Sequence, residues 1–140
     1  MKYGEQMILA HGFAKKLAQQ VTVRPDLVIP MPLHPAKLRE RGYNQANLLA
    51  SPLAKELHLK LLPDGCRRVR NTSPQTDLPW RERKKNMRDA FCCDADLTGK
   101  RVALVDDVMT TGASLNALAA AVQKRGATEI SAWVVARTMR

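Results

Sequence analysis

Apolar residues recur at three- and four-residue steps in several parts of the chain, which is the spacing of an amphipathic helix. One such part predicts an N-terminal helix within residues 1–24. Another covers residues 43–57, although Pro52 would cost about 3 kcal/mol in the interior of a helix. Either this helix kinks at Pro52, or Ser51 caps a second helix that has Pro52 at its first position.

Short apolar runs with β-branched residues indicate buried strands at residues 27–29, 102–105 and 130–135. Between the last two runs, residues 114–124 have helical spacing and Gly126 is a C-terminal stop. A strand, a helix and a strand in about 35 residues form a βαβ unit, so we expect parallel strands and an α/β fold. The remaining pattern predicts strands at residues 59–62 and 67–69, loops at 30–42 and 71–79, a charged helix at 80–89 and a turn at 97–100.

The length of 140 residues and the 45% apolar content suit a single domain that spans residues 1–140, with residues 25–140 as its core. No run of about 18 apolar residues is present, and the first residues lack the order of a secretory signal. We therefore expect no membrane partner and a cytoplasmic location.

The formal net charge is +10, and such a field attracts anions, whether nucleic acid or phosphorylated metabolites. The aromatic content is only 4%, which lowers the expectation of a single-strand nucleic-acid binder without removing it. Three cysteines without a C-x-x-C spacing predict neither a disulfide framework nor a zinc site.

The candidate ligand-binding residues cluster in the loop that follows the strand at residues 102–105. Asp106 and Asp107 stand at its carboxyl end, where ligands bind in parallel sheets, and adjacent acids can serve one ligand only if the strand ends there. Small residues up to the next helix let backbone amides and the helix dipole hold a phosphate. Carboxylates suit vicinal sugar hydroxyls with Mg²⁺ nearby, so the loop predicts a phosphoribosyl group. The alternative is structural: the acids end a strand, and Thr111 or Ser114 caps a helix.

Residues 102–114 resemble the signature of type I phosphoribosyltransferases, which bind 5-phosphoribosyl-1-pyrophosphate (PRPP). The resemblance implies that Asp106 and Asp107 hold the ribose 2- and 3-hydroxyls and that Mg²⁺ is held by them only indirectly, through ribose or water. It also implies that the following loop wraps the 5-phosphate, through Thr110, Thr111, Gly112, Ala113 and Ser114.

Three further stretches, at residues 30–34, 39–45 and 70–91, resemble the ComF/GntX-like branch, which is associated with competence and DNA use. Members of that branch usually carry an N-terminal cysteine-rich, zinc-binding segment, which residues 1–140 lack. We therefore expect either a fragment or a shortened form, and whatever that segment contributes to partners is not carried over.

In the wider family the loop at residues 30–34 holds pyrophosphate through backbone amides. Pro30 and Pro32 have no N–H, so the resemblance assigns this role to Met31, Leu33 and His34. A proline-stiffened turn, and a surface histidine without a role, are the alternatives.

Arg39 and Arg41 have the fork geometry that suits phosphate, or they belong to a solvated loop. The segment at residues 70–88 resembles the flexible loop that closes over PRPP, in which Arg83 and Lys84 are the candidates for steadying pyrophosphate. The alternative for this segment is a solvated helix face.

The first functional hypothesis is an enzyme in which a nitrogenous nucleophile displaces magnesium-bound pyrophosphate at ribose C1. The second is a non-catalytic PRPP sensor that binds nucleic acid through its basic surface. A phospho-acceptor receiver domain is a weaker third, because the chain lacks the separate acidic pair upstream that its magnesium would need. The pattern carries no signal for the acceptor or for the oligomeric state.

Overall fold

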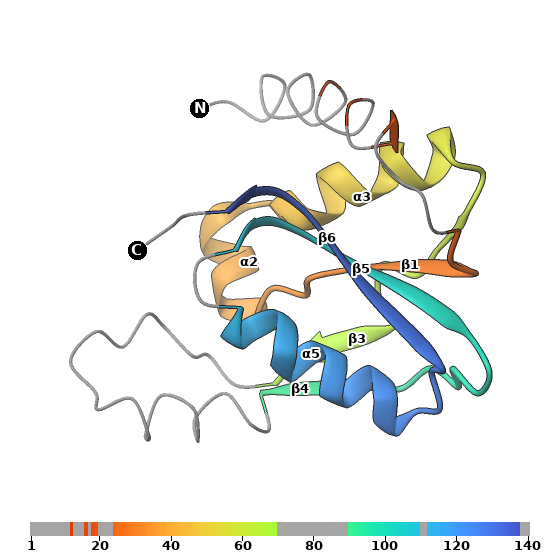
Figure 1. The fold of residues 1–140 in the computed structure, drawn as a ribbon. Coiled ribbons are helices and arrows are strands. Elements are labelled where there is room, and N and C mark those ends of the chain that lie inside the picture. The colour runs from red at the N-terminus through yellow and green to blue at the C-terminus, as the bar shows by residue number, and fades with distance from the viewer. Residues whose placement is uncertain are drawn as a thin grey trace.

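The computed structural model describes residues 24–69, 90–109 and 112–137, together with the isolated residues 12, 16, 18 and 19. Within these residues the central sheet has four parallel strands in the order β2, β1, β5, β6. They are β1 (Leu27–Pro30), β2 (Lys60–Leu61), β5 (Arg101–Met109) and β6 (Glu129–Arg137). The predicted α/β class and parallel βαβ unit are confirmed (Figure 1). The four isolated residues are helical, and the rest of the predicted N-terminal helix lies outside the described part.

Helices cover both faces of this sheet, α3 (Gln45–Glu56) on one and α5 (Ala113–Lys124) on the other (Figure 1). Strand residues alternate between the two cores: Leu27 and Ile29 pack with α5, whereas Val28 packs with α3. The α5 side also contains an antiparallel pair of strands, β3 (Cys66–Arg68) and β4 (Phe91–Cys93). We call this pair the β3–β4 ribbon.

Helix α3 runs through Pro52 without interruption, so a second helix capped by Ser51 is not formed. The proline removes one backbone donor, but Leu49 and Leu53 on the same helix are almost fully buried against the sheet. Each such burial contributes roughly 1.5–3 kcal/mol, which offsets the proline. Asn44 caps the helix, as its oxygen accepts from the Ala46 amide at 3.0 Å.

The predicted loop at residues 30–42 is partly wrong, because it contains the short helix α2 (Pro35–Arg41). His34 is the N-cap, with its Nδ1 accepting from the Ala36 amide at 3.1 Å, and Pro35 occupies the first helical position. Gly42 ends the helix with φ of 87°. No residue of α2 is buried, so the helix shows no apolar stripe from which its period could be recognised.

Strand β5 is longer than the apolar run that predicted it. It continues through both acids to Met109 and stays paired with β6, where Asp106 lies beside Val134 and Met109 beside Arg137. The expectation that the strand ends at the acids is therefore wrong. The two acids nevertheless stay in contact, because the Asp106 Oδ1 accepts from the Asp107 amide and the charge of Asp107 raises the pKa of Asp106. The backbone pairing with β6 carries the strand past the two acids, which interrupt the apolar run ahead of Val108 and Met109.

The other weak elements agree where they can be compared. The strands at residues 59–62 and 67–69 are confirmed as β2 and β3, and the turn at 97–100 is present. Gly126 follows the end of α5 with φ of 100°, and a Cβ there would lie 2.7 Å from the Cα of Thr98. This close approach fixes the helix end against the turn before β5. Residues 71–79 and 80–89 lie outside the described part of the chain.

Candidate functional site

The residues that follow β1 and the two acids near the end of β5 lie at the carboxyl edge of the sheet. Strands β1 and β5 are parallel neighbours, and Pro30 at the end of β1 lies beside Val105. The residues after Pro30 and the acids after Val105 therefore share one edge, which is where ligands bind in open parallel sheets. The register brings the predicted pyrophosphate loop and the predicted ribose-binding acids together.

Asp106 and Asp107 form an electrostatically coupled pair. The Asp106 Oδ1 accepts a hydrogen bond from the backbone N–H of Asp107 at 2.8 Å, and both side chains are half-buried. Burial, a side-chain hydrogen bond with Asp107 and repulsion from its charge raise the pKa of Asp106 to about 7. The ionised form of Asp106 is therefore poorly stabilised by the protein itself, because burial and the charge of Asp107 both disfavour it.

Arg68 on the β3–β4 ribbon lies near enough to Asp106 for the two charges to interact. Its guanidinium lies 5.2 Å from the centroid of the Phe91 ring, its cross-strand neighbour. Burial lowers the pKa of Arg68, whereas its proximity to Asp106 raises it, and the same proximity lowers the pKa of Asp106. The ribbon therefore brings a half-buried cation to the acids, which sequence reasoning missed. Arg68 is distant in sequence, and only the strand pairing places it here.

Helix α5 begins at this edge. Its N-cap is Gly112, with φ of 81°, so the cap residue has no side chain to bond the first-turn amides. Neither Ser114 nor an acidic residue provides the cap, which disfavours the structural alternative in which Ser114 merely caps the helix. Ala113 and Ser114 open the helix, in the position expected for amides that hold a phosphate. Thr110 and Thr111 lie outside the described residues.

The loop after β1 offers fewer donors than predicted. The N–H of Met31 donates to the carbonyl of Val105 at 2.8 Å, and its own carbonyl accepts from Asn44 Nδ2 at 3.1 Å. Met31 is also buried, so its predicted role as an amide donor to pyrophosphate is not compatible with this sheet. Leu33 and His34 remain as the backbone candidates, and the His34 imidazole caps α2 through Nδ1.

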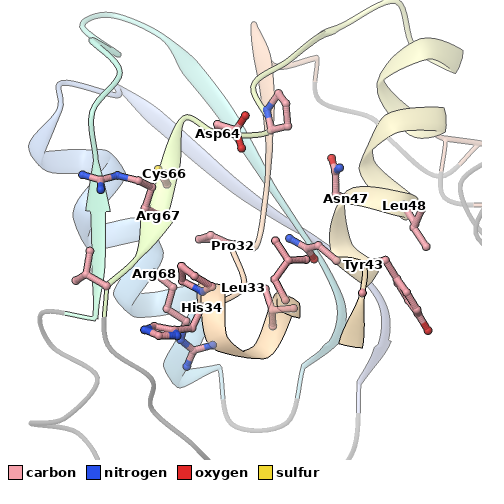
Figure 2. A pocket seen from close by; sticks show the side chains of 16 residues that line it. Pro32, Leu33, His34, Tyr43, Asn47, Leu48, Asp64, Cys66, Arg67 and Arg68 are labelled. Carbon is pink, nitrogen blue, oxygen red and sulfur yellow. The ribbon is translucent and has the colours of Figure 1, made fainter. Parts of the chain in front are cut away.

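A cavity of about 740 Å³ opens between this loop, α2, α3 and the start of the ribbon. Leu33, His34 and Arg68 line it, so it adjoins the acid pair through Arg68, although neither acid nor helix α5 lines it. Figure 2 shows His34 and Arg68 extending toward the same end of the cavity. Leu38 and Val69, which are 41% and 48% exposed, form apolar parts of its wall.

The other predicted basic residues divide into two groups. Arg39 and Arg41 are exposed in the last turn of α2, where positive charge complements the helix dipole, and they do not line the cavity. This position favours the solvated alternative for both. Arg83 and Lys84 lie outside the described residues.

The acid pair fits the magnesium that the fold family implies. Mg²⁺ uses one or two carboxylates together with substrate phosphates and keeps several waters, so it requires no complete protein cage. In the described part of the chain no group of three or more His, Cys, Asp or Glu side chains could hold a metal ion. Among the described ranges, no helix is long and apolar enough to cross a bilayer.

Comparison with known proteins places these features in a family context. Residues 45–140 match the family model of the phosphoribosyl transferase domain. The chain is 39% identical over 116 residues to Competence protein F of Haemophilus influenzae, and 35% identical over 115 residues to DNA utilization protein YhgH of Escherichia coli. These matches cover 81% and 82% of this chain and 51% of each relative, so the chain spans about half the length of the curated relatives it matches.

The fold also has a counterpart among solved structures. The purine phosphoribosyltransferase from Pyrococcus horikoshii matches with a TM-score of 0.55 at 22% identity, over 97% of this chain and 85% of that chain. At this identity the likeness shows the fold alone.

Proposed function

The chain belongs to the phosphoribosyl transferase domain family, and from this premise we propose that it binds PRPP with Mg²⁺ and transfers the phosphoribosyl group to a nitrogenous acceptor. One observation carries the proposal. The interacting carboxyls of Asp106 and Asp107 lie beside the loop after β1 and before α5, whose N-cap is Gly112. Acceptors for a sugar diol, amides for one phosphate and a nearby guanidinium together suit one phosphorylated ribose.

Each part of the site would act by position and charge. Asp106 and Asp107 accept hydrogen bonds from the ribose hydroxyls, and the first turn of α5 holds the 5-phosphate. The backbone amides of Leu33 and His34 bind the pyrophosphate. Arg68 is our addition to this set, because it lines the adjoining cavity and interacts electrostatically with Asp106. Arg83 and Lys84 are assigned to the leaving group by family resemblance.

In the proposed reaction, the bond from ribose C1 to pyrophosphate breaks and a bond from C1 to the acceptor nitrogen forms. The acceptor loses a proton to solvent, and pyrophosphate leaves with its charge balanced by the cationic side chains. Bound Mg²⁺ would supply charge neutralisation on the pyrophosphate. No nucleophilic side chain is required.

The test is thermal unfolding of the purified chain with Mg²⁺ and PRPP, compared with an Asp106→Asn, Asp107→Asn double variant. At ligand about 100 times its Kd, binding stabilises the native state by about 2.7 kcal/mol, which is a rise of several degrees in Tm. We expect this rise in the wild type and its loss in the variant. A folded wild type with no rise would refute PRPP binding.

Transfer is tested separately, by measuring pyrophosphate release with nucleobases, amines and ammonia as acceptors. Release that depends on one acceptor supports an enzyme. Tight PRPP binding without release for any acceptor would refute the transferase and leave the binding function.

The second candidate is a PRPP sensor that binds nucleic acid. The observations that favour it are the net charge of +10 and the names of the relatives, which are competence and DNA-utilization proteins. Binding to short single- and double-stranded DNA should then weaken steeply as salt rises, because neutralised phosphates release counterions. No binding at about 50 mM salt would exclude this candidate.

A further inference from the structure

The β3–β4 ribbon contains all three cysteines of the chain. Cys66 on β3 lies directly opposite Cys93 on β4, and both side chains are buried, at 3% and 7% exposure. Both belong to the core between the sheet and α5. Cys92 is half-buried, and as the neighbour of Cys93 on the strand it lies on the other face of the ribbon.

The hydrogen bonds of the ribbon show which kind of pair the two cysteines form. The Val69 amide donates to Ala90 at 2.7 Å, and the Asp94 amide donates to Gly65 at 3.2 Å. In an antiparallel ribbon, hydrogen-bonded and non-hydrogen-bonded pairs alternate. Gly65 and Asp94 form a hydrogen-bonded pair, so the next pair, Cys66 and Cys93, is non-hydrogen-bonded.

Such a pair suits a disulfide. Its Cα atoms are about 4.5 Å apart, the closest spacing that an antiparallel ribbon offers. Disulfides span roughly 4.4–6.8 Å between Cα atoms, so no backbone shift is needed to reach bonding range. Cys93 is also near enough to Cys66 to contribute to the raised pKa of the Cys66 thiol. Both side chains therefore lie on the same buried face of the ribbon, in directly opposite positions.

We propose that Cys66 and Cys93 are an oxidisable pair, which forms a disulfide across the β3–β4 ribbon when the protein meets a small-molecule disulfide such as oxidised glutathione. Two S–H bonds break and one S–S bond forms. The oxidant accepts the two electrons and, with the two protons, becomes two thiols.

Oxidation should be slow in the folded protein. Burial raises the pKa of the Cys66 thiol, and the neighbouring Cys93 raises it further. The attacking thiolate therefore forms mainly when the ribbon opens, and the rate should increase with pH. The bond would close a loop of about 28 residues and constrain the unfolded chain, so we expect a rise in Tm of roughly 5–10 °C.

The position of the cysteine pair relates it to the proposed function, but formation of the disulfide does not depend on that function. The pair lies at the base of the segment that joins β3 to β4, which includes Arg83 and Lys84. Arg68, two residues after Cys66, lines the cavity and interacts electrostatically with Asp106. The bond would hold the strand register that positions Arg68, whatever ligand the acids bind.

The experiment incubates the purified chain with oxidised glutathione, blocks the remaining thiols by alkylation, and maps the peptides by mass spectrometry without reduction. The expected product is a monomer with Cys66 linked to Cys93 and only Cys92 alkylated. Cys92→Ala leaves the proposed pair as the only thiols, and should form the same bond with the same rise in Tm.

Cys66→Ala and Cys93→Ala are the matched controls, since alanine is tolerated at a buried position better than a polar residue. Each retains two cysteines but should form no internal disulfide, and a melt confirms that each variant is folded. The proposal is overturned if folded Cys92→Ala keeps two free thiols under oxidant, forms a disulfide-linked dimer, or carries glutathione on both cysteines.

Discussion

Asp106→Asn should stabilise the unliganded protein at pH 8 while abolishing its response to PRPP. The folded-state pKa of Asp106 is about 7, whereas the ordinary value of 3.8 applies to the unfolded chain. The native state therefore holds the proton more tightly than the unfolded state does. This contribution to stability is fully present below about pH 4 and is lost as pH rises through about 7. Asparagine carries no charge and loses nothing over that range.

The size of the effect follows from the same shift. A rise from 3.8 to about 7, at about 1.4 kcal/mol per pH unit, sets a ceiling of about 4 kcal/mol. Partial exposure and the charge of Arg68 reduce this, so we expect about 1–2 kcal/mol, or a Tm higher by roughly 3–8 °C in the variant.

The assay is thermal unfolding of wild type and variant between pH 4 and pH 9 without ligand. The difference in Tm should grow from about pH 4 to pH 7 and then level off. Asp64→Asn, which removes an exposed carboxyl, is the control and should change little. A difference that is independent of pH, or a wild type more stable at pH 8, would refute the reasoning. With Mg²⁺ and PRPP the order should reverse, because only the wild type binds.

Substitutions at three further positions test the surrounding structure. Arg68→Ala should weaken PRPP binding at least tenfold and raise the pKa of Asp106. Arg68→Lys should restore the positive charge but not the planar fork of the guanidinium. Calorimetric titration measures the PRPP binding of both variants. Gly126→Ala should lower stability by about 2–4 kcal/mol, because φ is 100° and the new Cβ meets Thr98, and denaturant unfolding with an unchanged m-value checks it. Asn44→Asp should keep the α3 cap but lose the hydrogen bond to the Met31 carbonyl. Asn44→Ala should lose both interactions, which should lower the free energy of unfolding by about 1–2 kcal/mol in the same assay.

Sequence reasoning found the features that repeat with a period. The strand at residues 102–105 and the helix after it have regular apolar spacing, and Gly126 has a conformational reason to stand where it does. These signals are local, so one sequence is enough to find them. They predicted the βαβ unit and the position of Asp106 and Asp107 at the carboxyl edge of the sheet, and the structure confirms the unit.

The features that reasoning missed depend on partners distant in the chain. The extension of β5 through the acids is set by pairing with β6, and helix α2 has no buried residue to give a period. The sequence predicted Met31 as an amide donor to pyrophosphate, but its N–H donates to the Val105 carbonyl of β5. Arg68 reached the site through a ribbon whose strands are separated by more than twenty residues, which no local pattern encodes.

These missed contacts explain why the acid pair can persist in the unliganded fold. The backbone fixes Asp106 and Asp107 in a paired strand, so they cannot separate to relieve their repulsion. The relief must come from outside the sheet, and among the described residues Arg68 is the cation that lowers the pKa of Asp106. Stability and binding are therefore opposed at this site: a ligand that brings hydroxyl donors and a cation removes a cost that the empty site retains. Under the proposed function, a ribose diol with Mg²⁺ would remove this cost, so Asp106→Asn should be the more stable protein without PRPP and the less stable one with it.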